Sequence, residues 1–223
     1  MAIFNGIAAE YDDWYSQKKG AFVDRVETDL AHSMLKLESG MTVLDVGCGT
    51  GNFSMKLAGM GCIVTGIDVS EEMLNVAREK AAEKSLSISY LQMDATELIY
   101  QEEIFDAVVS IAAVEFIEDT AQAVKEMFRV AKVGGQILIG TINSDSDWGD
   151  YYQAKKLQEN SIYHYAAFKT IDDLKAWEPG ELAETGACLF IPPFAAEEEF
   201  TIEREKELSE TMRGGYICAL WRK

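Results

Sequence analysis

The segment from Val43 to Asn52 constrains this chain more than any other part of the sequence. A short apolar run ends in an acid at Asp45 and is followed, after one valine, by three glycines at alternate positions. Such a run bounded by glycine is typical of a buried parallel strand. The glycines allow a sharp turn and a close approach of the backbone to a ligand, and the helix that follows offers free N–H groups. We therefore predict a nucleotide-like ligand above Gly47, Gly49 and Gly51.

Two further acids follow apolar runs in the same way. The run 62–67 ends at Asp68, and the run 88–93 ends at Asp94. An acid at the end of the second strand can accept hydrogen bonds from ribose hydroxyls, and one after the third can accept from an adenine amino group. A strand-end aspartate can instead cap the next helix, but Ser70 already supplies such a cap. Three strand-end acids in this order predict an adenosine ligand.

The spacing of the glycines distinguishes between adenosine ligands. A dinucleotide site requires glycine at the first, third and sixth positions, and the sixth position here is Asn52. Asp45 would also place a negative charge near a pyrophosphate, whereas it suits a cation. The segment Asp45–Gly51, with Asp68 and Asp94, resembles the class I S-adenosylmethionine-dependent methyltransferases, over about residues 1–145. An NAD(P)-dependent oxidoreductase is the less favoured alternative.

The resemblance implies a cofactor, a product and a reaction. The cofactor is S-adenosylmethionine, the product is S-adenosylhomocysteine, and the methyl group goes to a small-molecule acceptor whose reacting atom stays open. A binding protein with a regulatory or partner role also remains open. The positions expected to contact the cofactor are Asp45, Gly47, Cys48, Gly49, Gly51, Asn52, Asp68, Val69, Met73, Met93, Asp94, Ala95 and Ser110.

Strand and helix patterns alternate along a single predicted domain, residues 1–223. Helices are expected over about 20–37 and 70–84, and a third has its buried face at 124–131 and ends at Gly134-Gly135. Later strands are expected at 105–111, 136–142, near 188–191 and at 216–221. This order predicts an α/β fold, a doubly wound, mainly parallel seven-stranded sheet with helices on both faces. The resemblance adds that the last strand is antiparallel and inserted beside the fifth.

Composition restricts the partners. The formal net charge is −18, from 38 acidic and 20 basic residues, which disfavours nucleic acid and anionic membrane surfaces. The four cysteines form no CxxC pair, so neither zinc nor a disulfide scaffold is expected. The start of the chain does not resemble a signal peptide, and no apolar run has membrane-spanning length. We expect a cytoplasmic protein with a small-molecule substrate, and a homodimer is compatible with the sequence.

Residues 1–37 are expected to form an N-terminal lid and helix. The segment Phe4–Asp12 resembles the entry segment of the branch that includes quinone-biosynthesis methyltransferases, where aromatic residues fold over the cofactor. Tyr11, Trp14 and Tyr15 are the matching aromatic side chains. They would shield the sulfonium from water and present ring faces to a cation. The alternative is that they only fasten the terminus to the core.

Residues 143–180 are expected to form a substrate-side insertion, because this family places substrate-specific segments there. The segment is dense in aromatic residues, which suits a lid or a wall around an apolar substrate, although a packed subdomain has the same composition. Asp145, Asp147 and Asp150 are predicted to be solvated rather than to bind a metal. His164 is a candidate general base, but a surface or packed imidazole is the preferred interpretation.

No catalytic residue can be assigned from the sequence, and Glu115, His164 and Tyr11 are the candidates. Glu115 follows the fourth strand and is either a substrate-binding acid or base, or a charge partner of a helix N-terminus, which is slightly preferred. The motif found here in enzymes that methylate nucleobase amino groups is missing. Ile191–Phe194 resembles it only superficially, and we interpret it as a turn that ends a strand.

Overall fold

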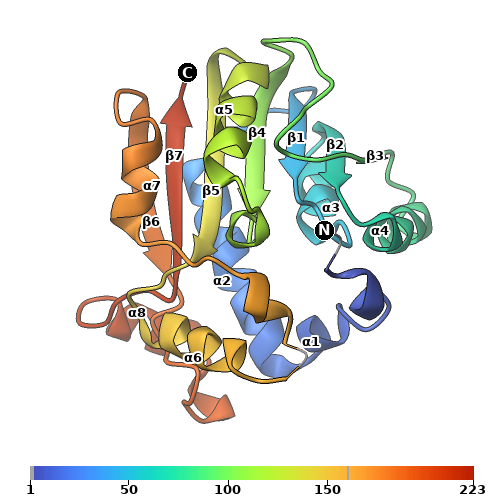
Figure 1. Cartoon of the computed structure of the whole chain (residues 1–223). Helices are drawn as coiled ribbons and strands as arrows, with labels where there is room; N and C mark the ends of the chain where they lie inside the picture. Colours follow the sequence, from blue (N-terminus) through green and yellow to red (C-terminus); the bar gives the residue numbers. More distant parts are fainter. Residues whose placement is uncertain (1–2, 160) are drawn as a thin grey trace.

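The computed structural model describes residues 3–159 and 161–223; residues 1, 2 and 160, which belong to the predicted lid and insertion, lie outside it. A single seven-stranded sheet has the strand order β3-β2-β1-β4-β5-β7-β6 (Figure 1). β7 pairs antiparallel with β5 and β6, and every other pair is parallel. The predicted sheet and the insertion of the antiparallel last strand beside the fifth are therefore confirmed. The strands are β1 (Thr42–Val46), β2 (Ile63–Asp68), β3 (Ser89–Gln92), β4 (Phe105–Ile111), β5 (Ala131–Ile142), β6 (Leu182–Cys188) and β7 (Tyr216–Arg222).

Helices cover both faces of the sheet, as the alternating pattern predicts. One face packs against α2 and α3, which contribute Phe22, Val26 and Leu57 to its core, and the other packs against α5 and α7. Figure 1 shows α2 behind the sheet and α5 in front of it. The α-helices are α1 (Asp13–Ser16), α2 (Lys18–Met34), α3 (Asn52–Gly59), α4 (Glu71–Glu83), α5 (Thr120–Val130), α6 (Asp147–Lys156), α7 (Ile171–Trp177) and α8 (Ile202–Leu208). Four 3-10 turns are η1 (Asn5–Ile7), η2 (Val114–Phe116), η3 (Ile162–Tyr165) and η4 (Glu197–Glu199).

The prediction of the sixth strand near residues 188–191 is wrong. β6 ends at Cys188, and Leu189 has a left-handed backbone with φ 66°. The carboxylate of Glu205, from α8, accepts the N–H groups of residues 189–191, including that of Ile191 at 3.2 Å. These residues are apolar because they are buried, but a side chain takes the hydrogen bonds that a strand would use. The turn predicted after them is present, since Ala195 donates its N–H to the carbonyl of Pro192 at 3.1 Å.

The prediction that Gly134-Gly135 ends a helix is wrong. α5 already ends at Val130, and β5 starts at Ala131, before the predicted start at 136. Gly134 has φ 78° and donates its N–H to the carbonyl of Lys223 at 2.6 Å. The pairing of β4 with β5 also shifts register between Phe105 and Ala107. The glycines therefore lie at an irregularity within the strand. Such an irregularity, like the end of a helix, favours a residue that can adopt positive φ.

The sheet positions the site at the carboxyl ends of its central parallel strands. β1 and β4 are neighbours at the point where the chain order reverses, and ligands of open α/β sheets bind outside the carboxyl ends of the strands at such a point. α1 and α6 gather at this end of the molecule (Figure 1). Within residues 3–159 and 161–223, no helix has the length and apolar character needed to cross a membrane.

Candidate functional site

A cavity lies at the carboxyl ends of β1 and β4. Its walls come from the glycine turn, the start of α3, the N-terminal segment, α2 and the end of β4. Ala112 in this last segment has φ 51°, a left-handed conformation that is strained for a residue with a side chain. The lining residues are Tyr11, Tyr15, Asp24, Glu27, Thr28, Asp45, Gly47, Cys48, Gly49, Thr50, Asn52, Phe53, Ile111 and Ala112.

The three glycines of the turn have different roles. All have positive φ, at 71° for Gly47, 53° for Gly49 and 78° for Gly51. A Cβ on Gly47 would lie 2.5 Å from the Cβ of Ala113, and one on Gly51 would lie 2.3 Å from the hydroxyl of Tyr90. A Cβ on Gly49 would meet nothing closer than the Cε of Met73 at 3.9 Å. Gly47 and Gly51 are therefore needed for packing, whereas Gly49 keeps a space open beside the cavity.

Asp45 is a buried acid at the end of β1. It is 2% exposed, and the hydroxyl of Ser54 donates to its Oδ2 at 2.5 Å. Burial raises the pKa of Asp45 to about 7, against the opposing effect of the Ser54 hydrogen bond. None of the lysines and arginines of the described residues forms an ion pair with it. A buried carboxylate without a cation fits the ammonium or sulfonium of a ligand.

Asp68 connects the end of β2 to the glycine turn. Its Oδ2 accepts the N–H of Gly49 and its Oδ1 accepts the N–H of Ser70, both at 2.9 Å. Burial raises the pKa of Asp68. Ser70 is the N-cap of α4, as predicted, and its hydroxyl accepts the N–H of Met73 at 3.1 Å. The acid predicted to bind a ribose thus also fixes the turn next to it.

The other predicted cofactor positions divide between the cavity and its surroundings. Cys48 and Asn52 line the cavity with Asp45, Gly47 and Gly49, and burial raises the pKa of the Cys48 thiol, so a thiolate is disfavoured there. The remaining positions lie outside the cavity lining. Val69 and Asp94 are exposed, and Asp94 accepts hydrogen bonds from Thr96. Met93 and Ala95 belong to the core on the α5 side of the sheet. Ser110 is buried, and its hydroxyl donates to the carbonyl of Val46 at 2.9 Å.

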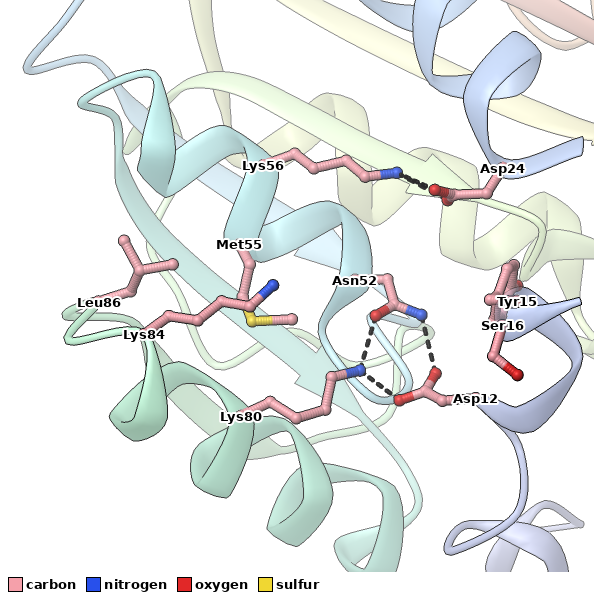
Figure 2. Close-up of a pocket in the computed structure, with 10 residues that line it drawn as sticks. All are labelled: Asp12, Tyr15, Ser16, Asp24, Asn52, Met55, Lys56, Lys80, Lys84 and Leu86. Carbon is pink, nitrogen blue, oxygen red and sulfur yellow. Dashed lines mark hydrogen bonds and ion pairs between the residues drawn. The ribbon is translucent and has the colours of Figure 1, made fainter. Parts of the chain in front are cut away.

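The N-terminal segment is fastened to the glycine turn through Asp12. Its Oδ1 accepts from the hydroxyl of Thr50 at 2.8 Å and from the amide of Asn52 at 2.9 Å. Lys80, from α4, pairs with Asp12 and donates to Asn52 at 2.6 Å (Figure 2). These contacts border a second cavity of about 440 Å³ between the N-terminal segment, α3 and α4, whereas the cavity at the glycine turn has a volume of about 70 Å³.

Of the candidate catalytic residues, Tyr11 lines the cavity, and Glu115 lies three residues beyond Ala112, which also lines it. Tyr11 lines the cavity with its ring centroid 5.9 Å from that of Tyr15, and burial raises its pKa to about 12. Glu115 is 1% exposed, and its Oε2 accepts from the hydroxyl of Thr141 at 3.0 Å. Burial raises the pKa of Glu115 to about 7. Glu115 lies in the first turn of η2, and Asp119 caps α5.

The insertion contributes an aromatic wall and a surface histidine. Aromatic rings follow one another from the N-terminal segment into the insertion, with centroid distances of 4.9 Å for Phe4–Phe116, 6.1 Å for Phe116–Tyr163 and 4.6 Å for Tyr163–Tyr152. His164, in contrast, is exposed on η3.

The aspartates at the start of the insertion lie near the N-terminus of α6. Asp145 pairs with Arg213, and Asp147 and Asp150 lie in the first turn of α6. No group of three His, Cys, Asp or Glu side chains suited to a metal ion occurs among residues 3–159 and 161–223.

Sequence analysis missed the acidic face of α2. Asp24, Glu27 and Thr28 all line the cavity, and Lys56 donates to both carboxylate oxygens of Asp24, at 2.6 and 2.7 Å. Burial raises the pKa of Glu27 to about 8. The signal was available, since positions i, i+3 and i+4 share one face of a helix, but nothing in the sequence showed that this face meets the glycine turn.

The chain resembles known proteins in sequence and in fold. Residues 44–139 match a methyltransferase domain model. An uncharacterised protein of Methanocaldococcus jannaschii is 30% identical over 75% of this chain and 74% of its own length. A ubiquinone biosynthesis O-methyltransferase of Coxiella burnetii is 38% identical over 64% of this chain, and the match spans only 61% of that protein. A Thermotoga maritima structure, described as a SAM-dependent methyltransferase and possible histamine N-methyltransferase, has a TM-score of 0.76 and 22% identity, covering 99% of this chain and 98% of its own.

The residues present fit the methyl donor of this family. Gly49 leaves space at the cavity, Asp45 is a buried acid without a cation, and Asp68 stands at the end of the neighbouring strand. Fold and relatives agree: the chain belongs to the class I S-adenosylmethionine-dependent methyltransferases.

Proposed function

We propose that this methyltransferase transfers the methyl group of S-adenosylmethionine to a small organic acceptor enclosed between the glycine turn and the aromatic wall. The observation that carries the proposal is that Tyr11 and Tyr15 line the same cavity as Gly47 and Gly49. The acidic surface of the chain, with a net charge of −18, argues against a nucleic-acid acceptor. The names of the compared proteins, which mention ubiquinone biosynthesis and histamine, support a small acceptor but leave its reacting atom open.

The chain's own residues bind and orient the donor and the acceptor, and they exclude water from the site. When bound, S-adenosylmethionine supplies a methyl group activated by a positively charged sulfur. We assign to Asp45 the binding of a cationic part of the donor, and to Asp68 the acceptance of hydrogen bonds from ribose hydroxyls. Tyr11 and Tyr15 shield the site from water and hold the acceptor against the methyl group. Orientation of this kind can account for a large part of the rate enhancement.

The test combines binding with turnover. Calorimetry should show that S-adenosylhomocysteine binds and that NAD does not. Transfer of a labelled methyl group from S-adenosylmethionine should then be measured against a panel of phenols, amines and thiols. Binding without transfer to any acceptor would favour a regulatory or partner role instead, and binding of NAD alone would refute the proposal.

A further inference from the structure

The acids around the cavity differ in their partners. Asp24 is neutralised by Lys56, and Asp12 by Lys80. Asp45 and Asp68 belong to the part of the site assigned to the methyl donor. Two acids remain on the acceptor side without a lysine or arginine within ion-pair distance among the described residues, and they are Glu27 and Glu115.

Glu27 is a half-buried acid of α2 that faces the glycine turn. It lines the cavity with Tyr11 and Gly47, and its carboxylate accepts no side-chain hydrogen bond from the described residues. Burial raises its pKa, and the nearby charges of Asp24 and Glu115 add to the shift, whereas Lys56 opposes it. A carboxylate desolvated in this way gains a partner when a cation enters the cavity.

Glu115 holds a polar atom that is buried and has no partner. Thr141 donates to its Oε2, but Oε1 has no hydrogen bond. Burial raises the pKa of Glu115, and the charge of Lys169 opposes the shift. Buried polar atoms are almost always satisfied, so an orphaned carboxylate oxygen indicates a missing partner. Glu115 lies three residues beyond Ala112, which lines the cavity, and the residue after it, Phe116, contacts Phe4 and Tyr163.

The aromatic wall next to these acids already faces an ammonium. The Nζ atom of Lys155 lies 4.5 Å from the ring centroid of Tyr151, 5.5 Å from that of Tyr152 and 5.7 Å from that of Tyr163. Rings within about 6 Å of a cation attract it through their quadrupoles. Tyr11, closer to the glycine turn, offers the same kind of ring.

We propose that the acceptor is an amine, which enters as its ammonium ion and is held by Glu27 and Glu115 beside the aromatic wall. This inference rests on the proposed function and assigns its substrate class. An ammonium ion favours the ionised form of both acids and pairs with it, whereas phenolate and carboxylate acceptors oppose that ionisation in a site with low access to water.

The chemistry balances without another reactant. An ammonium ion has no free electron pair, so it must first lose a proton, and the unpartnered Oε1 of Glu115 accepts it. The nitrogen lone pair then forms the new N–C bond while the C–S bond breaks, and the electron pair of that bond stays on sulfur as a neutral thioether. The product is an N-methylammonium ion, and the proton on Glu115 leaves to water. A proton acceptor works best when its pKa lies near the operating pH.

The experiment uses three probes that share a 4-hydroxyphenylethyl group and differ in its terminal group, which is an ammonium, a hydroxyl or a carboxylate: tyramine, tyrosol and 3-(4-hydroxyphenyl)propanoate. Binding is measured by calorimetry in the presence of S-adenosylhomocysteine, and methylated products are assigned by NMR. Tyramine should bind at least about tenfold more tightly than tyrosol, as a charge-assisted contact requires, and it should be methylated on nitrogen. The propanoate should bind least.

Variants of the two acids test whether these side chains cause the preference for tyramine. Glu27→Gln and Glu115→Gln should each reduce tyramine affinity about tenfold or more while affinity for S-adenosylhomocysteine stays within about twofold. Glu203→Gln changes an exposed acid of α8 and is the matched control. Equal binding of tyramine and tyrosol, or methylation on the phenol oxygen, would overturn the amine assignment and leave the proposed function intact. Failure of S-adenosylhomocysteine to bind would instead overturn the proposed function itself.

Discussion

The two halves of the site are built in different ways. The donor half consists of the glycine turn and the ends of β1 and β2, and it depends on backbone conformation, as at Gly49 with φ 53°. The acceptor half consists of side chains from distant elements, such as Glu27 on α2 and Tyr163 in the insertion. A backbone-built half admits few substitutions, whereas a half built from side chains can change its ligand. Substitutions in the donor half should therefore weaken or abolish binding of the donor, and those in the acceptor half should alter only the acceptor.

The largest effect is expected at Gly49. Gly49→Val adds a branched side chain in the space beside the cavity, at a backbone conformation that costs such a residue about 1–3 kcal/mol. We expect calorimetry to detect no binding of S-adenosylhomocysteine, while circular dichroism shows a folded protein. Gly40→Val is the matched control, because Gly40 has φ 89° and a Cβ there would meet nothing within 4 Å. Normal binding by Gly49→Val would remove the donor from this turn.

A smaller loss is expected at Asp68. Asp68→Ala removes the proposed partner of the ribose and also the acceptor for the N–H groups of Gly49 and Ser70. Losing a charge-assisted hydrogen bond costs about 1.5–3 kcal/mol, so affinity for S-adenosylhomocysteine should fall roughly tenfold or more. Glu72→Ala, at an exposed acid in the first turn of α4, should leave it unchanged. Unchanged affinity in a folded Asp68→Ala protein would place the ribose elsewhere.

The contrast also explains what could be predicted from the sequence. The strands and the glycine turn depend on patterns within a few residues, so β1, β2 and β4 were found almost to their ends. The sixth strand was misplaced because apolar residues 189–191 are buried without being paired, and the acid that binds their N–H groups, Glu205, lies outside any local pattern. Glu27 was missed for the same reason, since its role depends on which surface meets α2.

The two acids of the acceptor half should make the free energy of unfolding depend on pH. The pKa of Glu27 is raised from 4.5 to about 8, and that of Glu115 from 4.5 to about 7. Between pH 4.5 and these raised values, the two glutamates are ionised in the unfolded chain but still protonated in the folded protein. The free energy of unfolding therefore falls as pH rises from about 4.5 to about 8. Glu27→Gln removes one such group. At pH 8 it should stabilise the protein by about 1 kcal/mol, or raise Tm by about 2–4 °C, with little change at pH 5.

Thermal unfolding from pH 4.5 to 8.5 measures this effect. Glu203→Gln, at an exposed acid, should leave the profile unchanged. A Glu27→Gln profile parallel to that of the wild type would mean that Glu27 is solvated in the absence of ligand, which would weaken the contrast between the two halves.

The smallest effect concerns the contact between the halves, where the N-terminal segment is held at the glycine turn by Asp12. Asp12→Asn loses the charge that Lys80 pairs with, while its amide oxygen can still accept from Thr50 and Asn52. A partly exposed ion pair of this kind contributes about 1 kcal/mol, so hydrogen exchange of residues 8–15 should accelerate about fivefold without ligand. Glu10→Gln, at an exposed acid of the same segment, is the control.

If the segment is a lid, S-adenosylhomocysteine should slow exchange of residues 3–15 in the wild type, because lids close over their ligands. Deleting residues 1–15 should then reduce turnover much more than it reduces Tm, since terminal segments contribute little to the core. Equal protection with and without ligand, together with a large loss of Tm on deletion, would show that the segment is structural. The acceptor half would then be a fixed chamber, and an acceptor would have to reach Glu27 and Glu115 from the side of the insertion.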